Sequence, residues 1–528
     1  MRGVLEFCVC LTIAVTLVRT FAAEGYVIET GSMAPCLLGN HRWAECTSCG
    51  EKYCVDESRA AEPAVCPNCG LRGIDVGQNL RNDGDQLLVF RAGYEYRVPR
   101  RWEVVVFRNP GQPTQAYVKR IAGLPGDAIQ IIDGDVYVAG QIQTKSLATQ
   151  RGMRIPVYDH DHRPPDDDPE WRPRWIPDGT GPQSPAHWRT AGGAFVYDDL
   201  EAQPPAEAAR PPLSWLRYRH WVRRGGTHAT SVCLPLPPPQ VEEFASPGEP
   251  LTWRSNSNEL VCHGAMPAEL YSRLRSAGTT DGWQKTVDQL FEGSHIAPIT
   301  DGYGYNRARD GAGANEVRDL MICFNLSIIA GQGEFALALS DGAATFECLF
   351  DVSRRQIRLK DVASEKVVRT ARLPANLFPG PALVEFSLMD HQVALAVAGQ
   401  ELFEPWNSAA PQGRGPTPWA PVRIGARGLN LRVDGVRLFR DVYYTGGPGR
   451  RGCSSPVVLQ PGEFFALGDN SPVSRDSRSW PEGKVLTREL LLGKPFLVHL
   501  PSRRHRLRFG RWQGDIRIPD LSRIRYIH

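Results

Sequence analysis

The sequence lacks an excess of charge of either sign. Its 61 Lys and Arg residues nearly balance 58 Asp and Glu residues, which leaves a net charge of +3 over 528 residues. Such a balance gives no reason to expect a nucleic-acid partner. Basic residues gather near the C-terminus, from Arg503 to Arg525, where they indicate either a solvated tail or attraction to anionic lipid head groups.

Long helical periodicity is also scarce. The chain has 51 Gly and 43 Pro, and its apolar residues alternate in short runs. We therefore expect a mainly β protein, long enough for about two to four domains. Alternation predicts strands at residues 86–90, 103–107, 116–121, 128–132 and 135–138, with a hairpin turn at Asp133-Gly134.

Long apolar runs are rare, and the one membrane candidate lies at Val4 to Ala23. About twenty apolar residues can span a bilayer, and Glu6 and Arg19 lie near the margins, where side chains can reach water. The alternative is a cleaved secretory signal, since Phe21-Ala22-Ala23 resembles a cleavage site.

Histidine is missing from the three stretches that look chemically active, residues 28–35, 117–127 and 468–478. A serine nucleophile there needs another base. A lysine can serve only when it is neutral, and because its ordinary pKa is about 10.4, it has to be desolvated or placed near other cations. Lys119 lies in a β-type run where Tyr117 and Ile121 share its face as apolar cover. The alternative is a surface lysine on an amphipathic strand.

These three stretches, in this order behind an apolar N-terminus, resemble bacterial type I signal peptidase (leader peptidase), a serine protease with a Ser–Lys dyad. The resemblance implies that Ser32 is the nucleophile and Lys119 the general base. It implies that Thr30 helps to form the oxyanion hole beside the Ser32 amide, and that Ser474 orients the lysine amine. Supporting roles fall to a salt-bridged cluster of Arg120, Asp476 and Arg478, to a turn of Gly468, Asp469 and Asn470, and to the pocket walls Ile28 and Val118.

The chain departs from the resemblance at a few positions. Glu29 stands where many relatives have Pro, Cys36 stands where Thr is usual, and Ser471-Pro472-Val473 replaces a more polar stretch. None of these changes removes a group that the chemistry needs. No cofactor is expected for catalysis.

Two CxxC pairs interrupt the first part of the pattern, at Cys46, Cys49, Cys66 and Cys69. Their spacing is typical of a zinc ribbon, and four thiolates would close a tetrahedral shell, so we predict a structural Zn²⁺ site. Disulfide pairing is the alternative, because the resemblance implies an exoplasmic location.

The middle of the chain has a different texture, with short alternating strands separated by Gly, Asp and Pro. Predicted strands include residues 321–329, 333–339, 344–350, 356–360, 382–388 and 392–397. This spacing predicts a β-sandwich at about residues 186–444, loosely similar to a laminin-G or concanavalin-like fold. It could bind sugars or proteins, or be purely structural. The polar run at residues 159–168 is interpreted as a solvated linker.

The predicted organisation is therefore a signal-peptidase-like antiparallel β domain with a β-sandwich inserted into it. Residues 1–23 are a transmembrane anchor, 24–150 the first catalytic part with a ribbon at 46–70, 151–455 the inserted region, and 456–528 the second catalytic part with a basic tail. We favour a retained anchor because cleavage would release the serine from the membrane.

The predicted function is a membrane-anchored serine endopeptidase that removes signal peptides from exported preproteins. The resemblance implies a single-pass protein of the plasma (inner) membrane, with its N-terminus cytoplasmic and its catalytic body on the periplasmic side. Its partners would be signal peptides, the lipid bilayer and the secretion translocon. Two alternatives are a cell-surface binding protein on an inactive protease scaffold and a self-cleaving Ser–Lys regulator.

Overall fold

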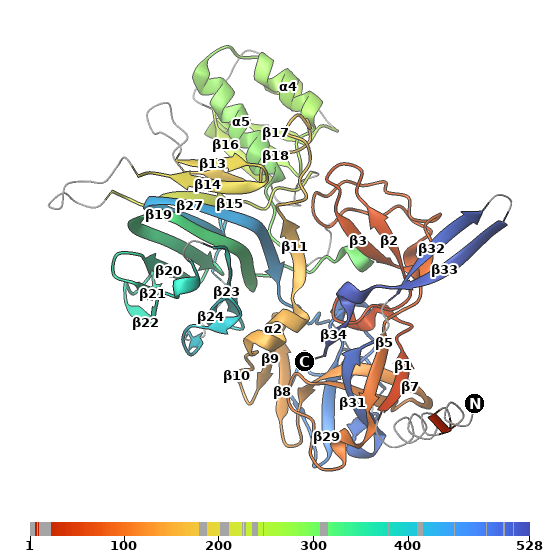
Figure 1. Ribbon diagram of the computed structural model, residues 1–528. Helices are drawn as coiled ribbons and strands as arrows, with labels where there is room; N and C mark the ends of the chain where they lie inside the picture. The colour runs from red at the N-terminus through yellow and green to blue at the C-terminus, as the bar shows by residue number, and fades with distance from the viewer. Residues whose placement is uncertain are drawn as a thin grey trace.

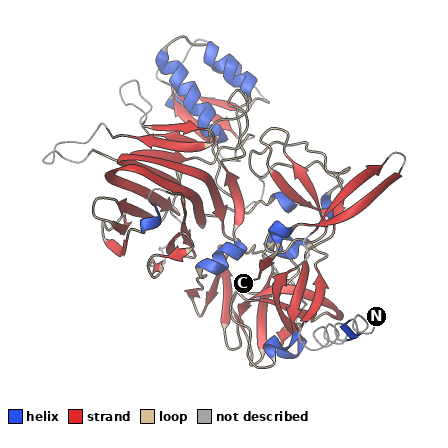
Figure 2. Ribbon diagram, in the orientation of Figure 1, coloured by secondary structure: helices blue, strands red, loops and turns tan. Residues whose placement is uncertain are grey.

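The computed structural model describes residues 6, 7, 9 and 23–527, apart from 179–186, 201–210, 224, 226–228, 235–240, 246–247, 307–314, 378–379, 409–414, 448, 482, 500–501 and 510–511. Antiparallel strands dominate it, which confirms the mainly β prediction (Figure 2). The anchor predicted at residues 1–23 lies almost wholly outside the described residues. Within them, no helix combines the length and the apolar character that crossing a membrane requires.

Both ends of the chain build one eight-stranded sheet, which we call the terminal sheet (Figure 1). Its order is β1-β5-β31-β6-β7-β29-β30, and β34 pairs with β31. The N-terminal part supplies β1 (Ala23–Val27), β5 (Gln86–Phe90), β6 (Val104–Asn109) and β7 (Gln112–Gly123). The C-terminal part supplies β29 (Glu463–Leu467), β30 (Leu486–Thr487), β31 (Leu491–Val498) and β34 (Arg525–Tyr526).

The terminal sheet forms because its strands carry apolar, β-branched residues. In β6, Val104, Val105, Val106 and Phe107 are all buried, as expected of a central strand that is covered on both faces. A second sheet of order β10-β9-β8-β28 follows in sequence. Its strands are β8 (Ala128–Ile132), β9 (Asp135–Val138), β10 (Gln141–Ile142) and β28 (Val457–Val458).

The inserted region forms a fourteen-stranded sheet around the long strands β19 (Leu320–Ser340) and β27 (Val422–Arg440). It is entered through the helix α2 (Leu147–Met153). Before β19 come β11 (Ile155–Asp159), β12 (Trp175–Pro177), β13 (Trp188–Ala191), β14 (Ala194–Asp198) and β15 (Ser214–Tyr218). Between β19 and β27 come β20 (Thr345–Asp351), β21 (Gln356–Asp361), β22 (Val367–Arg372), β23 (Ala382–Met389), β24 (Gln392–Val397), β25 (Gln400–Glu401) and β26 (Trp406–Asn407).

One predicted break in this region is wrong. The strands expected at residues 321–329 and 333–339 are a single strand, β19, whose pairing with β27 shifts register near Gly331. Gly331 has a φ of +106°, and a Cβ there would lie 2.4 Å from the Gly428 carbonyl oxygen. The glycine therefore makes a bulge that bends the strand without ending it.

The all-strand interpretation of the inserted region is also wrong in one place. The helix α5 (Asp281–His295) packs over a sheet of β16 (Ala229–Cys233), β18 (Glu259–His263) and β17 (Leu251–Arg254) (Figure 1). The helix α4 (Ala268–Ser276) packs on α5, and a short helix, α3 (Val241–Phe244), contacts β17. Thr280 caps α5 by accepting a hydrogen bond from the Trp283 amide. Trp283, Val287, Leu290 and Phe291 form its buried stripe, a helical spacing that could have been found in the sequence.

Two smaller units complete the fold. The ribbon sheet has the order β3-β2-β4, with β2 (His41–Glu45), β3 (Lys52–Asp56) and β4 (Arg81–Asn82). A hairpin of β32 (Ser502–Phe509) and β33 (Trp512–Pro519) projects beyond it, so the basic C-terminal stretch is in large part a paired hairpin (Figure 1). The run at residues 159–168 is not wholly solvated, since His160 is buried and stacks on Phe195.

Candidate active site

Ser32 lies in a tight turn directly after the first strand of the terminal sheet. The turn is the short 3₁₀ segment η2 (Gly31–Met33), and Thr30 precedes it in extended backbone. Backbone hydrogen bonds fix both sides, since the Ile28 amide donates to Asp85 and the Asn40 amide donates to Glu29. The sequence therefore folds here into a pinned loop with a half-buried serine.

Lys119 reaches this turn from β7. Its Nζ donates a hydrogen bond to Ser32 Oγ at 2.7 Å and a second one to the Val118 carbonyl at 2.9 Å. The side chain is only 3% exposed. The structure thus brings together the two residues that the sequence predicted as nucleophile and base, although they are 87 positions apart.

The surroundings of Lys119 favour its neutral form. Burial lowers the pKa of its amine to about 8, an effect that the Asp476 and Asp469 carboxylates partly oppose and that Arg478 reinforces. The Tyr117 ring lies 5.3 Å from Nζ, so it covers the amine as its position on the strand predicted. A lysine with this pKa can accept a proton near neutral pH.

Thr30 stands beside the nucleophile. Its Oγ1 is 3.5 Å from Ser32 Oγ, at the outer limit of a hydrogen bond, and its side chain is exposed. This places a hydroxyl next to the Ser32 hydroxyl, on the open side of the turn.

Two buried ion pairs support the dyad. Arg120 forms a two-fold pair with Asp469, through Nε at 2.9 Å and Nη2 at 2.7 Å. Arg478 pairs in the same way with Asp476. The sequence predicted one salt-bridged cluster of Arg120, Asp476 and Arg478. The structure has two separate ion pairs instead, and Asp469 is the partner of Arg120.

These pairs set the charge near Lys119. Burial would raise the pKa of Asp476, but Arg478 holds that carboxyl below its ordinary pKa. Arg120 also donates to the Cys36 sulfur at 3.6 Å, at the position where Thr was expected.

Ser474 differs from expectation. Its Oγ is buried and, within the part of the chain that the structure describes, forms no hydrogen bond with the Lys119 amine; it lies instead near the Asp476 carboxylate, whose pKa it helps to lower. It lies against Gly468, where a Cβ would come within 2.2 Å of Ser474 Oγ. A side chain at position 468 would collide with Ser474, so this close approach requires a glycine at position 468.

The remaining predicted residues lie close to the nucleophile. Ile28 is buried and Val118 is half-buried, and both belong to one apolar cluster beneath the Ser32 turn. The Asn470 amide group donates to the Gly31 carbonyl at 2.8 Å, and its backbone N–H donates to the Ser32 carbonyl at 3.0 Å. Asn470 therefore holds the turn directly.

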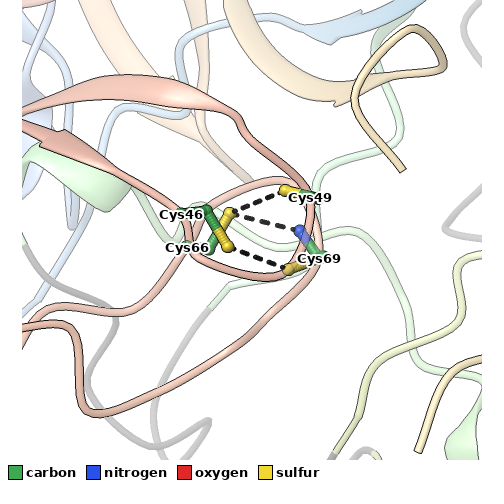
Figure 3. Close-up of side chains that lie close together, drawn as sticks. All are labelled: Cys46, Cys49, Cys66 and Cys69. Carbon is green, nitrogen blue, oxygen red and sulfur yellow. Dashed lines mark hydrogen bonds between the residues drawn. The ribbon is translucent and has the colours of Figure 1, made fainter. Parts of the chain in front are cut away.

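The four cysteines of the ribbon converge at one point (Figure 3). Cys46 Sγ lies 3.5 Å from Cys69 Sγ, and Cys49 Sγ lies 3.6 Å from Cys66 Sγ, too far apart for disulfide bonds of about 2.05 Å. A tetrahedral Zn²⁺ with Zn–S bonds of about 2.3 Å would separate its sulfurs by about 3.8 Å. The spacing and the buried thiols therefore fit a closed metal shell.

Sequence reasoning missed one contributor to this site. The segment Gly304–Asn306, called η6, comes from the inserted region and touches both Gly31 and Asn470. No pattern in the sequence could have indicated it, because the contact depends on how the inserted region packs.

Comparison with known families bears on this geometry. Residues 74–180 match the family model described as signal peptidase, peptidase S26. The match contains Lys119, and Ser32 lies before it. It supports a peptidase of the signal peptidase type.

Individual relatives agree. The signal peptidase I of Rickettsia bellii (strain OSU 85-389) is 28% identical over 130 residues, covering 25% of this chain and 37% of the relative. The signal peptidase I of Rickettsia felis is 29% identical over 136 residues, covering 26% of this chain and 41% of the relative. The chain thus spans less than half the length of these curated relatives.

Solved structures add little. A carbohydrate binding module, CBM66 from Bacillus subtilis, is 9% identical, covers 23% of this chain and 74% of its own, and has a TM-score of 0.19. A score this low carries no argument about the inserted region.

Proposed function

We propose that this protein is a membrane-anchored serine endopeptidase that removes signal peptides from exported preproteins. The observation that supports this best is the 2.7 Å contact between Ser32 Oγ and the buried Lys119 Nζ. Acyl transfer by serine requires a base beside the hydroxyl, and this lysine can be neutral near physiological pH. About a tenth of such amines are neutral at pH 7, against fewer than about one in a thousand for an ordinary lysine.

In the proposed reaction, the neutral Lys119 amine accepts the hydroxyl proton as Ser32 Oγ attacks the scissile carbonyl carbon. The Ser32 backbone N–H and the Thr30 hydroxyl stabilise the oxyanion that forms. The C–N bond then breaks, the leaving amine takes the proton from Lys119, and an acyl-enzyme remains. Water attacks this ester with Lys119 again acting as base, which releases the new carboxylate and restores Ser32.

The substrate side is proposed to lie along β1 and β7. Ile28 and Val118 would line shallow pockets for small side chains at the −1 and −3 positions of the signal peptide, in keeping with their shared apolar cluster. Arg120, Asp469, Asp476 and Arg478 would hold the surrounding loops.

The location is proposed from the sequence around the first strand. Ser32 follows Ala23 by nine residues, a stretch that spans at most about 30 Å. An anchor retained at residues 1–23 would keep the dyad beside the periplasmic face of the plasma membrane, where signal peptides emerge from the translocon. The N-terminus would then be cytoplasmic.

We also propose that Cys46, Cys49, Cys66 and Cys69 hold one structural Zn²⁺. Bound there, the metal would brace the ribbon without an open position for chemistry. Elemental analysis of the full chain is expected to find one Zn per chain, and none after Cys49→Ser combined with Cys69→Ser. Disulfide-linked peptides in a non-reducing digest would contradict the metal site.

The test of the peptidase proposal is cleavage of a preprotein by the full chain in detergent. Wild type should release the mature chain after a small-x-small sequence, and Ser32→Ala and Lys119→Ala should not. Lys52→Ala is the matched control, because this exposed lysine on β3 pairs only loosely with Glu45. The proposal fails if wild type processes none of several preproteins, or if either dyad variant keeps full activity.

A further inference from the structure

The inserted region reaches the catalytic turn through one short segment. The segment η6 (Gly304–Asn306) follows α5 in the chain and packs against β3 of the ribbon sheet. Within it, Tyr305 is buried and stacks on Tyr303 with ring centroids 5.8 Å apart. Two units that interrupt the catalytic pattern therefore meet beside the nucleophile.

Tyr305 fills the space next to the residue that precedes Ser32. A Cβ at Gly31 would lie 2.2 Å from Tyr305 Cε1 and 2.7 Å from Asp56 Oδ2, so the ring and the ribbon approach the Gly31 backbone directly. The ring also packs with Ala34 and Leu38, which follow the nucleophile. The turn that carries Ser32 is thus enclosed on this side by residues outside the catalytic pattern.

Asn306 adds hydrogen bonds to this contact. Its side-chain amide pairs reciprocally with that of Asn470, and the Asn470 amide donates to Asn306 Oδ1 at 2.7 Å. Asn470 is buried and holds the Gly31 and Ser32 carbonyls. A continuous chain of hydrogen bonds therefore runs from the inserted region to the backbone of the nucleophile.

We propose that Tyr305 and Asn306 are positioning residues that hold the Ser32 turn in register with Lys119. The proposal rests on the peptidase function proposed above. It gives the inserted region a role in the reaction without requiring it to touch the substrate. The physical reason is that a buried amide must keep its partners, so loss of Asn306 leaves Asn470 free to shift along with the carbonyls that it holds.

The expected effect is larger on turnover than on substrate binding. A displacement of about 1 Å between reacting groups can cost about a hundredfold in rate. Asn306→Ala should therefore lower kcat by about 10–100-fold and leave KM within about twofold, because Asn306 bonds to Asn470 and the pocket walls Ile28 and Val118 are held by an apolar cluster.

A second readout follows from the enclosure of Lys119. If the turn loosens, water reaches the amine, and the acid limb of the rate profile should move to higher pH. The charged groups that face Lys119 are Asp476, Arg478 and Asp469, and none of them is changed in the variant.

The experiment compares the full chain in detergent with Asn306→Ala, Asn306→Leu and Asn315→Ala. Asn306→Leu keeps about the same side-chain size and adds no charge, but it removes both hydrogen bonds to Asn470, so it should act in the same direction even if the alanine variant folds poorly. Asn315→Ala is the control. Asn315 follows Asn306 in the inserted region, and this variant also loses a side-chain hydrogen bond, but the partner is Asp301 and not Asn470. Each variant is assayed for kcat, KM, the pH profile and melting temperature.

A measurement that does not depend on proteolysis separates the two proposals. Modification of Lys119 by an amine-reactive reagent, followed by mass spectrometry as a function of pH, should shift to higher pH in both Asn306 variants and stay unchanged in Asn315→Ala. If labelling shifts while no preprotein is cleaved, the positioning role stands and the peptidase function fails. Folded Asn306 variants with wild-type kcat and labelling would overturn the positioning role.

Discussion

Two buried lysines in this molecule have pKa values that are shifted in opposite directions. Lys119 and Lys145 are 3% and 2% exposed, so both have lost nearly all contact with water. Lys119 donates to a hydroxyl and a carbonyl, and burial lowers the pKa of its amine to about 8. Burial would also lower the pKa of Lys145, but carboxylates in direct contact raise it well above the ordinary value.

The difference comes from where the carboxylates are directed. Lys145 binds both oxygens of Asp390, at 2.6 and 2.8 Å, and Asp441 at 2.7 Å. The carboxylates near Lys119, Asp469 and Asp476, are instead bound two-fold by arginines. Burial therefore lowers the pKa of a lysine toward neutral pH only where the neighbouring carboxylates are already paired with other cations.

The two lysines also lie in different parts of the fold. Lys145 lies between β10 and α2, where the chain leaves the terminal part for the inserted region, and its partners follow β23 and β27. The Trp102 ring from the terminal part lies 4.7 Å from its amine. Lys145 thus fastens the inserted region, whereas Lys119 lies against the Ser32 hydroxyl within the terminal part.

The largest effect should come from removing the reactive lysine. Lys119→Met should lower kcat for preprotein cleavage by about 10²–10⁴-fold, because a general base is lost. Its melting temperature should equal or exceed that of wild type, since a poorly solvated amine is replaced by an apolar chain. A clear drop in melting temperature would show that Lys119 is structural, like Lys145.

The next effect concerns the fastening lysine. Lys145→Met should lower the free energy of unfolding by about 3–5 kcal/mol, because the buried carboxylates of Asp390 and Asp441 lose the cation that binds both of them. Denaturant unfolding of the full chain measures this value. If Lys145→Met had the same free energy of unfolding as Lys119→Met, the conclusion that only Lys145 stabilises the fold would be wrong.

The pH dependence of stability should also separate the two. The folded pKa of Lys119, about 8, lies below its unfolded value, so this group destabilises the fold below pH 8, and the penalty disappears as pH rises toward about 10.4. The stability gap between Lys119→Met and wild type should therefore shrink between pH 7 and 10. Lys145 has a raised folded pKa, so its contribution should persist across that range.

The smallest effect concerns the ring beside Lys119. Tyr117→Leu keeps the apolar cover but removes a cation–π contact worth about 0.5–1 kcal/mol to the charged amine. The acid limb of the cleavage profile should move to lower pH by about half a unit. A shift in the opposite direction would mean that the ring acts mainly by excluding water.

The sequence predicted the dyad and much of the terminal part because those features are local. Strands β5, β8, β9 and β24 begin and end where alternation placed them, and the spacing of the cysteines predicted their convergence. Ser32 and Lys119 were found because each lies in a recognisable stretch. The inserted region was harder, since a glycine bulge in β19 looked like a turn and the buried stripe of α5 was overlooked.

The contacts between units could not be predicted in the same way. Lys145, Asp390 and Asp441 are unremarkable in sequence, and their pairing depends on the packing of three separate chain segments. The Asn306–Asn470 pair joins residues 164 positions apart. Such pairs leave no local pattern, because the same residue types also occur on any solvated surface.

The strand order of the terminal sheet has a consequence for the timing of activity during synthesis. Strand β31 lies between β5 and β6 in the sheet. The hydrogen bonds that connect β1 and β5 to β6 and β7 therefore run through residues 491–498; β1 ends shortly before Ser32, and β7 carries Lys119. The ribosome makes those residues after the whole inserted region. We therefore expect a nascent chain to gain the proposed peptidase activity only after these last strands have joined the two parts of the sheet by hydrogen bonds.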